Sequence, residues 1–274
     1  GILQLMFNAV DIIVVGRFSG KQALAAVGST TALINVFTNL FIGISLGANV
    51  LAARFYAMGK SKEMSETVHT SITLAMVSGV IMAFVGVLFA RGALELMGTP
   101  DDVIDQSTLY MRIYFMGMPF FMLYNYGAAI LRAIGDTKRP LLFLIISGLI
   151  NAALNMLLVI YCHMAVEGVA IATVISNILS ASLVIHCLHH RRDEFQFRFH
   201  DMRIKWTDLK KILIIGIPAG IQGAIFSISN VFIQSGINSF GEDAIAGSSL
   251  ALNFEYFTYD IANAFAQAAV TKSE

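Results

Sequence analysis

The chain is a series of apolar stretches, each long enough to cross a lipid bilayer, separated by short polar loops. The 23 residues 140–162, for example, would extend roughly 34 Å as a helix, against a hydrocarbon core of about 30 Å. Eight such stretches are predicted, at 1–18, 28–57, 67–90, 105–133, 140–162, 166–189, 209–238 and 244–271. The pattern therefore predicts an all-α polytopic membrane protein.

Composition agrees with this interpretation. Hydrophobic residues make up 57% of the chain and charged residues 13%. Such a composition is expected of membrane helices, because lipid-facing helices are apolar around their circumference and charged residues are confined to the loops. No cleavable signal peptide is evident. The chain opens inside an apolar run without an initiator Met and stops soon after a complete crossing, which favours a piece of a longer protein. Cys162 and Cys187 are expected to be unpaired.

The basic residues fall mostly in loops on one side of the predicted membrane. Of 18 Lys and Arg residues, 14 follow the even-numbered stretches. The four assigned to the other side are Arg17, Lys21, Arg91 and Arg112. By the positive-inside rule, the loops after the even-numbered stretches and the start of the first stretch are cytoplasmic. We expect a bacterial-type inner (plasma) membrane.

The longest polar segment, 191–208, is the one candidate for an internal boundary. Its cations and aromatic residues suit a cytoplasmic linker lying along lipid headgroups, and a solvated loop is the alternative. We therefore expect a first lobe at 1–190, a linker at 191–208 and the start of a second lobe at 209–274. A weak repeat supports two lobes, because aligning Val10 with Val231 also aligns Gly20 with Gly241. Many secondary transporters are built from such repeats.

Prolines and small residues predict where helices bend and where two helices pack closely. Pro119 falls within the fourth stretch and Pro218 within the seventh, and either ring removes a helix hydrogen bond and can bend the segment. Two small-xxx-small pairs are predicted to form close helix contacts, Gly43 with Gly47 and Gly216 with Gly220.

Ionisable residues inside a bilayer cost roughly 3 kcal/mol each and are functional candidates by default. Three occur here, Asp11, Glu255 and Asp260. Asp11 is either a functional carboxylate or an interfacial partner of Arg17. The other two either line a cavity or form hydrogen-bonded pairs with Gln222, Asn230 or Tyr256.

A second group of polar residues is neutral. Asn151 and Asn155 lie one turn apart and point the same way, and Thr173 and Ser176 on the next stretch could face them. Such oxygen atoms, with one carboxylate, can hold a hard cation or a proton network. Hydrogen bonding between helices is the alternative.

Three motifs resemble one known family. They are LRAIGDTKRP at 131–140, INAALN at 150–155 and GVAIATVIS at 168–176, together with the first stretch and its loop from Val10 to Val27. Through these motifs the chain resembles the multidrug and toxic compound extrusion (MATE) family, and the resemblance extends over its whole length. The resemblance implies a helical bundle of two six-helix lobes, of which this chain holds the first lobe and the first two helices of the second. It also implies efflux of cations driven by a proton or sodium gradient.

The resemblance places an ion or proton site at Asp11, Asn151, Asn155 and Thr173. Asn155 stands where that pattern has a carboxylate, so the site has one acid in place of two, and protonation of Asp11 is the favoured coupling step. Glu255, Asp260, Gln222 and Asn230 are a second candidate polar site. We expect small organic, cationic substrates, a lipid bilayer as surroundings, a monomer, no nucleic acid, no cofactor and no metal beyond sodium at the first site.

Other functions are weighed against this one. A related lipid or polysaccharide flippase shares the two-lobe plan, but it is expected to line its cavity with more Arg and Lys. A membrane enzyme is less favoured, because no catalytic motif is found and His186, His189 and His190 look like headgroup contacts. A purely structural membrane protein would not need Asp11 in the bilayer.

Overall fold

The structure is a computed structural model that describes every residue except 1, 192, 194, 253, 256–257 and 259–274. Its regular elements, in the part it describes, are helical. They are α1 (Ile2–Phe18), α2 (Gly20–Ala57), α3 (Ser61–Leu96), α4 (Asp101–Met116), α5 (Met118–Ala133), α6 (Lys138–Asn155), a π-helix η1 (Met156–Tyr161), α7 (Val166–His189), a 3₁₀ turn η2 (Phe199–Asp201) and α8 (Trp206–Asn238). A further helical stretch, 242–252, follows Gly241.

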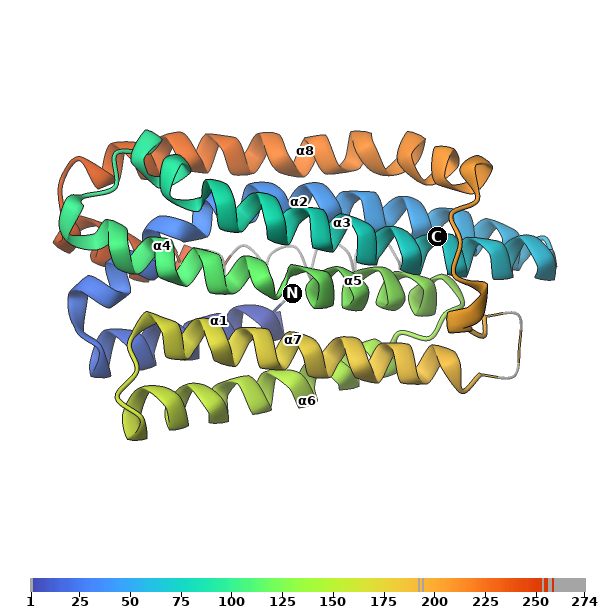
Figure 1. The fold of residues 1–274 in the computed structure, drawn as a ribbon, viewed down its shortest axis with the longest axis horizontal. Helices are drawn as coiled ribbons and strands as arrows, with labels where there is room; N and C mark the ends of the chain where they lie inside the picture. The colour runs from blue at the N-terminus through green and yellow to red at the C-terminus, as the bar shows by residue number, and fades with distance from the viewer. Residues whose placement is uncertain (1, 192, 194, 253, 256–257, 259–274) are drawn as a thin grey trace.

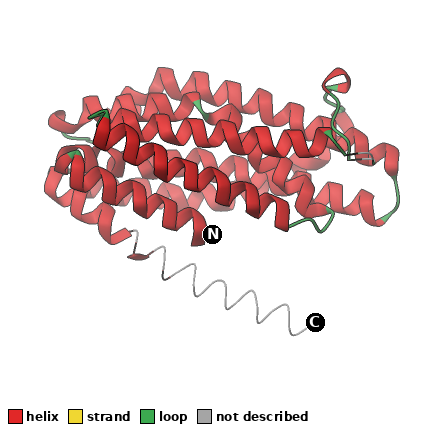
Figure 2. Cartoon of the chain, turned by 90° about the horizontal axis from the view of Figure 1, so that it is seen from below, coloured by secondary structure: helices red, strands yellow, loops and turns green. Residues whose placement is uncertain are grey.

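The long helices lie side by side along one axis (Figures 1 and 2). Five of the described helical segments are long and apolar enough to span a membrane, namely α2, α3, α6 with η1, α7 and α8. The protein is accordingly a multi-pass membrane protein. We call the end where α7 stops and α8 starts the linker end, and the opposite end, where α1 meets α2, the Gly20 end.

Several predicted boundaries were wrong by six to eight residues. The second stretch begins at Gly20, where φ is +86°, and not at 28, because the polar residues after the glycine are already helical. The third runs over 61–96 and not 67–90. Both helices continue beyond the apolar core into residues that suit the headgroup region.

The fourth predicted stretch is two helices and not one. α4 ends at Met116 and α5 begins at Met118, with Gly117 between them. Pro119 lies in the first turn of α5, where its missing N–H costs nothing, and the Phe121 amide begins the new ladder by donating to the Gly117 carbonyl at 3.1 Å. Pro218, by contrast, sits inside a continuous α8.

α2 and α8 pack together along most of their length through the two predicted glycine pairs. A Cβ added at Gly43 would lie 2.2 Å from the Cα of Gly220, and one added at Gly47 would lie 2.2 Å from the carbonyl oxygen of Ile212. Only glycine allows backbones to approach this closely. We call this contact the glycine seam.

The weak sequence repeat has a structural counterpart at the Gly20 end. Gly20 and Gly241, paired in the repeat, both have positive φ, at +86° and +85°, and a helix starts at Gly20 and directly after Gly241. Gly28 and Ser249 are also paired in the repeat, and a Cβ added at Gly28 would lie 1.7 Å from Ser249 Oγ. One pair of positions matched in the repeat, Gly28 and Ser249, therefore lies in contact.

Candidate functional site

Three of the four residues assigned to the ion or proton site are joined by hydrogen bonds between α1 and α6. Asp11 lies on α1, and Asn151 and Asn155 lie one turn apart on α6. The Asn155 amide nitrogen donates to a carboxylate oxygen of Asp11, and it donates to Asn151 Oδ1 at 3.2 Å. Asn155 is fully buried and Asn151 almost so, while Asp11 is half-buried.

The Asn151 amide fits its surroundings in two orientations, which differ by exchange of its oxygen and nitrogen. In one, the nitrogen faces Ser176 Oγ at 3.4 Å. In the other, the nitrogen donates to Asp11 Oδ1 at 3.0 Å and the oxygen accepts from the Thr173 backbone N–H at 3.3 Å. In this second orientation Thr173 meets the cluster through its backbone, while its hydroxyl donates to the Val169 carbonyl at 3.0 Å.

One acceptor in the cluster has no partner. The side-chain oxygen of Asn155 is buried and makes no hydrogen bond within the described part of the chain. Buried polar atoms are nearly always satisfied, so an orphaned oxygen beside a carboxylate marks a place suited to a cation or a proton donor.

The helix carrying the two asparagines changes its winding directly after them. Residues Met156–Tyr161 form a π-helix, with the Cys162 amide donating to the Leu157 carbonyl at 3.1 Å. Such segments are rare and often lie at functional sites. The sequence analysis did not predict this feature.

Two tyrosines that the sequence analysis missed also belong to this region. Tyr110 and Tyr114 on α4 interact electrostatically with Asp11, and their rings lie 6.1 Å apart. Their spacing of four residues places both on one face of α4. That spacing was the available signal, but it does not reveal which face of α4 turns into the bundle.

The second candidate polar site is not assembled in the described residues. Gln222 and Glu255 are exposed and Asn230 is half-buried. No hydrogen bond connects these three side chains among the residues that the structure describes. Asp260 and Tyr256 lie outside the described residues.

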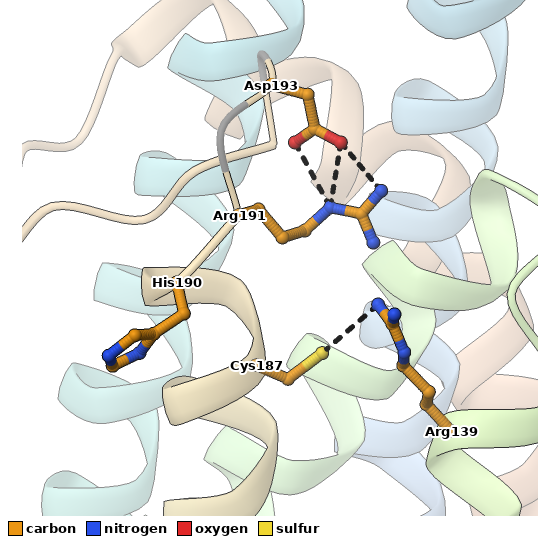
Figure 3. A pocket seen from close by; sticks show the side chains of 5 residues that line it. All are labelled: Arg139, Cys187, His190, Arg191 and Asp193. Atoms are coloured by element: carbon orange, nitrogen blue, oxygen red, sulfur yellow. Dashed lines mark hydrogen bonds and ion pairs between the residues drawn. The ribbon is translucent and has the colours of Figure 1, made fainter.

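A polar pocket of about 370 Å³ lies at the linker end (Figure 3). Arg191 donates to Asp193 at 2.6–3.1 Å, and Arg139 Nη1 lies 3.8 Å from the sulfur of Cys187. The hydrogen bond to Asp193 raises the pKa of Arg191. Burial alone raises the pKa of Asp193. The hydrogen bond and charge of Arg191 lower it by more, so the pKa of Asp193 lies below its usual value. The pair of Arg191 and Asp193 lies directly after α7, in the segment that leads to α8.

Metal ligation has little support in the described residues. Cys162 and Cys187 are free, and no group of three or more His, Cys, Asp or Glu side chains is placed to hold a metal ion there. His189 and His190 instead contact backbone carbonyls, of Phe197 at 2.9 Å and of His186 at 3.0 Å.

Comparison with known proteins agrees with the motifs noted in the sequence. The MatE family model matches residues 1–157. The chain belongs to the MatE family. This is the multidrug and toxic compound extrusion family of the sequence resemblance, and its members are transporters, so the membrane-enzyme alternative is set aside.

Curated relatives come from several bacteria. The probable multidrug resistance protein YoeA of Bacillus subtilis is 34% identical over 252 residues, which cover 89% of this chain and 54% of that protein. The probable multidrug resistance protein NorM of Thermotoga maritima is 26% identical over 94% of this chain and 56% of that protein. A FAD transporter of Shewanella oneidensis is 24% identical over 93% of this chain and 57% of that protein. The chain spans about half the length of these relatives.

Solved structures share the fold. An inward-facing MATE transporter superposes with a TM-score of 0.83 at 24% identity, covering 91% of this chain and 57% of that one. The MATE multidrug transporter DinF-BH, solved in complex with a ligand, gives a TM-score of 0.86 at 22% identity, covering 93% of this chain and 58% of that one. A MATE-like helical bundle is therefore the fold of this chain.

Proposed function

We propose that this chain is part of a secondary active efflux transporter that exports organic cations in exchange for protons or sodium ions by alternating access. The observation that carries the proposal is the cluster of Asp11, Asn151 and Asn155 between α1 and α6. It combines a carboxylate in a membrane-spanning bundle with amides that can pair in more than one way. Relatives described as multidrug resistance proteins support the same function.

In this proposal Asp11 is the coupling group. A ligand or proton shifts a conformational equilibrium only through its different affinity for the two states. Protonation of Asp11 removes the charge that Asn155 now pairs with, and Asn151 re-pairs by turning its amide. Sodium bound by the same oxygens is the alternative coupling ion, with Thr173 completing the set.

The proposal also assigns the larger architecture. Residues 1–190 form the first lobe, 191–208 a linker and 209–274 the start of the second lobe. The linker end is cytoplasmic, as the distribution of Lys and Arg favours, and the membrane is the bacterial inner membrane. The protein is a monomer that takes small organic substrates.

The test replaces Asp11 with Asn in the full-length protein. We expect efflux of a cationic dye, driven by an ion gradient in everted membrane vesicles, to fall to the level of vesicles without the transporter. Expression and elution from size-exclusion chromatography should be unchanged, because Asn keeps the shape of the side chain. Asp101→Asn, which removes an exposed carboxylate from α4, is the matched control. Unchanged dye efflux by a well-folded Asp11→Asn protein would disprove the role of Asp11.

A further inference from the structure

The segment 198–206, which we call the strap, is held against α3 at both ends. The backbone N–H of Arg198 donates to His69 Nε2 at 3.1 Å, and the backbone N–H of Lys205 donates to Thr70 Oγ1 at 3.1 Å. His69 and Thr70 are both buried. Just before the strap, the buried Phe197 ring packs against the His69 ring with centroids 5.5 Å apart. The strap therefore has a defined conformation despite being largely outside regular structure.

The outward side of the strap is apolar. Phe199 is 61% exposed, Trp206 73%, Ile204 41% and Met202 37%. Two aromatic residues and two aliphatic ones gathered on nine residues would be costly in water, whereas Trp is typical of the membrane interface. The strap is fixed by contacts to buried residues and exposes apolar side chains. It therefore presents these side chains to apolar surroundings.

The same segment is basic. It contains Arg198, Arg203 and Lys205 against one acid, Asp201. The Arg198 side chain donates to the neutral oxygen of Gln196 at 2.9 and 3.1 Å, so its charge is not neutralised by that contact. Arg203 and Lys205 share one carboxylate, Glu66. A net positive charge therefore accompanies the apolar side chains.

The position of the strap identifies what it meets. It runs across the linker end of the bundle from the end of α7 to the start of α8, while α2 and α3 extend beyond it (Figure 1). Basic side chains interleaved with aromatic ones at this depth match the phosphate and acyl-chain boundary of a leaflet. We propose that the strap is a docking site for anionic phospholipid headgroups of the leaflet at the linker end, with Phe199 and Trp206 inserted at the interface and Arg198 and Arg203 on the phosphates.

Trp206 is the one Trp of this sequence and reports directly on the proposal. The full-length protein, with any Trp outside residues 1–274 replaced by Phe, is reconstituted in phosphatidylcholine alone or in an equal mixture with phosphatidylglycerol. We expect a blue shift of Trp206 emission and a loss of acrylamide quenching in the mixture, together with quenching by a lipid labelled near its headgroup. High salt should reverse the difference between the two lipid compositions.

Variants separate lipid binding from a structural role. Arg198→Gln with Arg203→Gln should abolish the effect of phosphatidylglycerol on Trp206. Lys62→Gln, which removes an exposed charge at the same end but outside the strap, should leave the effect intact. Thr70→Val removes the acceptor that fixes Lys205 and should weaken the effect without removing any charge.

Three results would overturn the proposal. One is equal acrylamide quenching of Trp206 in both lipid compositions, and another is no quenching by the headgroup-labelled lipid. The third is a Trp206 signal that changes only when a soluble protein fraction is added, which would indicate a protein partner for the strap.

Discussion

Asn155 decides how much positive charge the polar cluster can hold. It occupies the position where the MATE pattern has a carboxylate, and here it contributes one donor to Asp11 and one buried oxygen without a hydrogen-bond partner among the described residues. With one acid, the cluster carries a single negative charge. A proton that binds Asp11 neutralises this charge completely. A sodium ion would instead have to shed its water for mostly neutral oxygens.

We predict that Asn155→Asp shifts coupling of the full-length protein toward sodium. A second carboxylate beside Asp11 raises the affinity of the cluster for a cation, because two like charges at short range favour binding a counter-ion. The measurement is dye efflux from vesicles energised with either a sodium or a proton gradient. Asn177→Asp is the matched control, since it adds the same charge at a half-buried position on α7. An unaltered preference between the two gradients in Asn155→Asp would contradict the prediction.

The four residues of the candidate site could be named from the sequence because short motifs carry them. Their convergence could not be derived from spacing, since Asp11 and Asn155 are 144 positions apart and meet only through packing of α1 on α6. Tyr110 and Tyr114 were missed for the same reason. Nothing local to α4 tells which of its faces turns into the bundle.

At the scale of helices, the glycine seam between α2 and α8 brings two backbones into close contact. Helix association in a membrane has little hydrophobic driving force, so close packing of small residues contributes much of it. The two small-xxx-small pairs could be read from the sequence, but their pairing with each other could not. The break at Gly117 was equally hidden, because a proline alone allows either a bend or a new helix.

We predict that Gly43→Ala destabilises the protein by about 1–3 kcal/mol, because the new Cβ would meet the Gly220 backbone, which cannot move aside as a side chain can. The midpoint of thermal unfolding in detergent should fall. Gly236→Ala on α8 is the control, since a Cβ there meets no atom within 4 Å. It should be neutral or slightly stabilising, as Ala favours a helix over Gly. Equal midpoints of thermal unfolding for the two variants would mean that the glycine seam has room for a Cβ at Gly43.

At the scale of the whole molecule, α2 and the helical stretch 242–252 meet at the Gly20 end. Lys21 Nζ lies 2.9 Å from Asp243 Oδ1, and both side chains are 73% exposed, so this ion pair contributes little stability. The contact of Gly28 with Ser249 is tighter and buried. Alternating access between two proposed lobes requires contacts at one end to separate in part of the cycle, and this contact is a candidate for that role.

We predict that a disulfide between Gly28→Cys and Ser249→Cys, in a protein whose Cys162 and Cys187 are replaced by Ser, stops dye efflux. A Cβ built on Gly28 lies 2.9 Å from the Ser249 Cβ. A disulfide needs about 3.8 Å, so the two helices must separate by only roughly 1 Å for the bond to form. Oxidation should abolish efflux by the full-length protein, and dithiothreitol should restore it, because the bond holds the Gly20 end closed. Each single-cysteine variant, oxidised in the same way, should remain active. Undiminished efflux by fully cross-linked protein would show that this contact stays closed throughout transport, and the moving boundary would then lie elsewhere between the lobes.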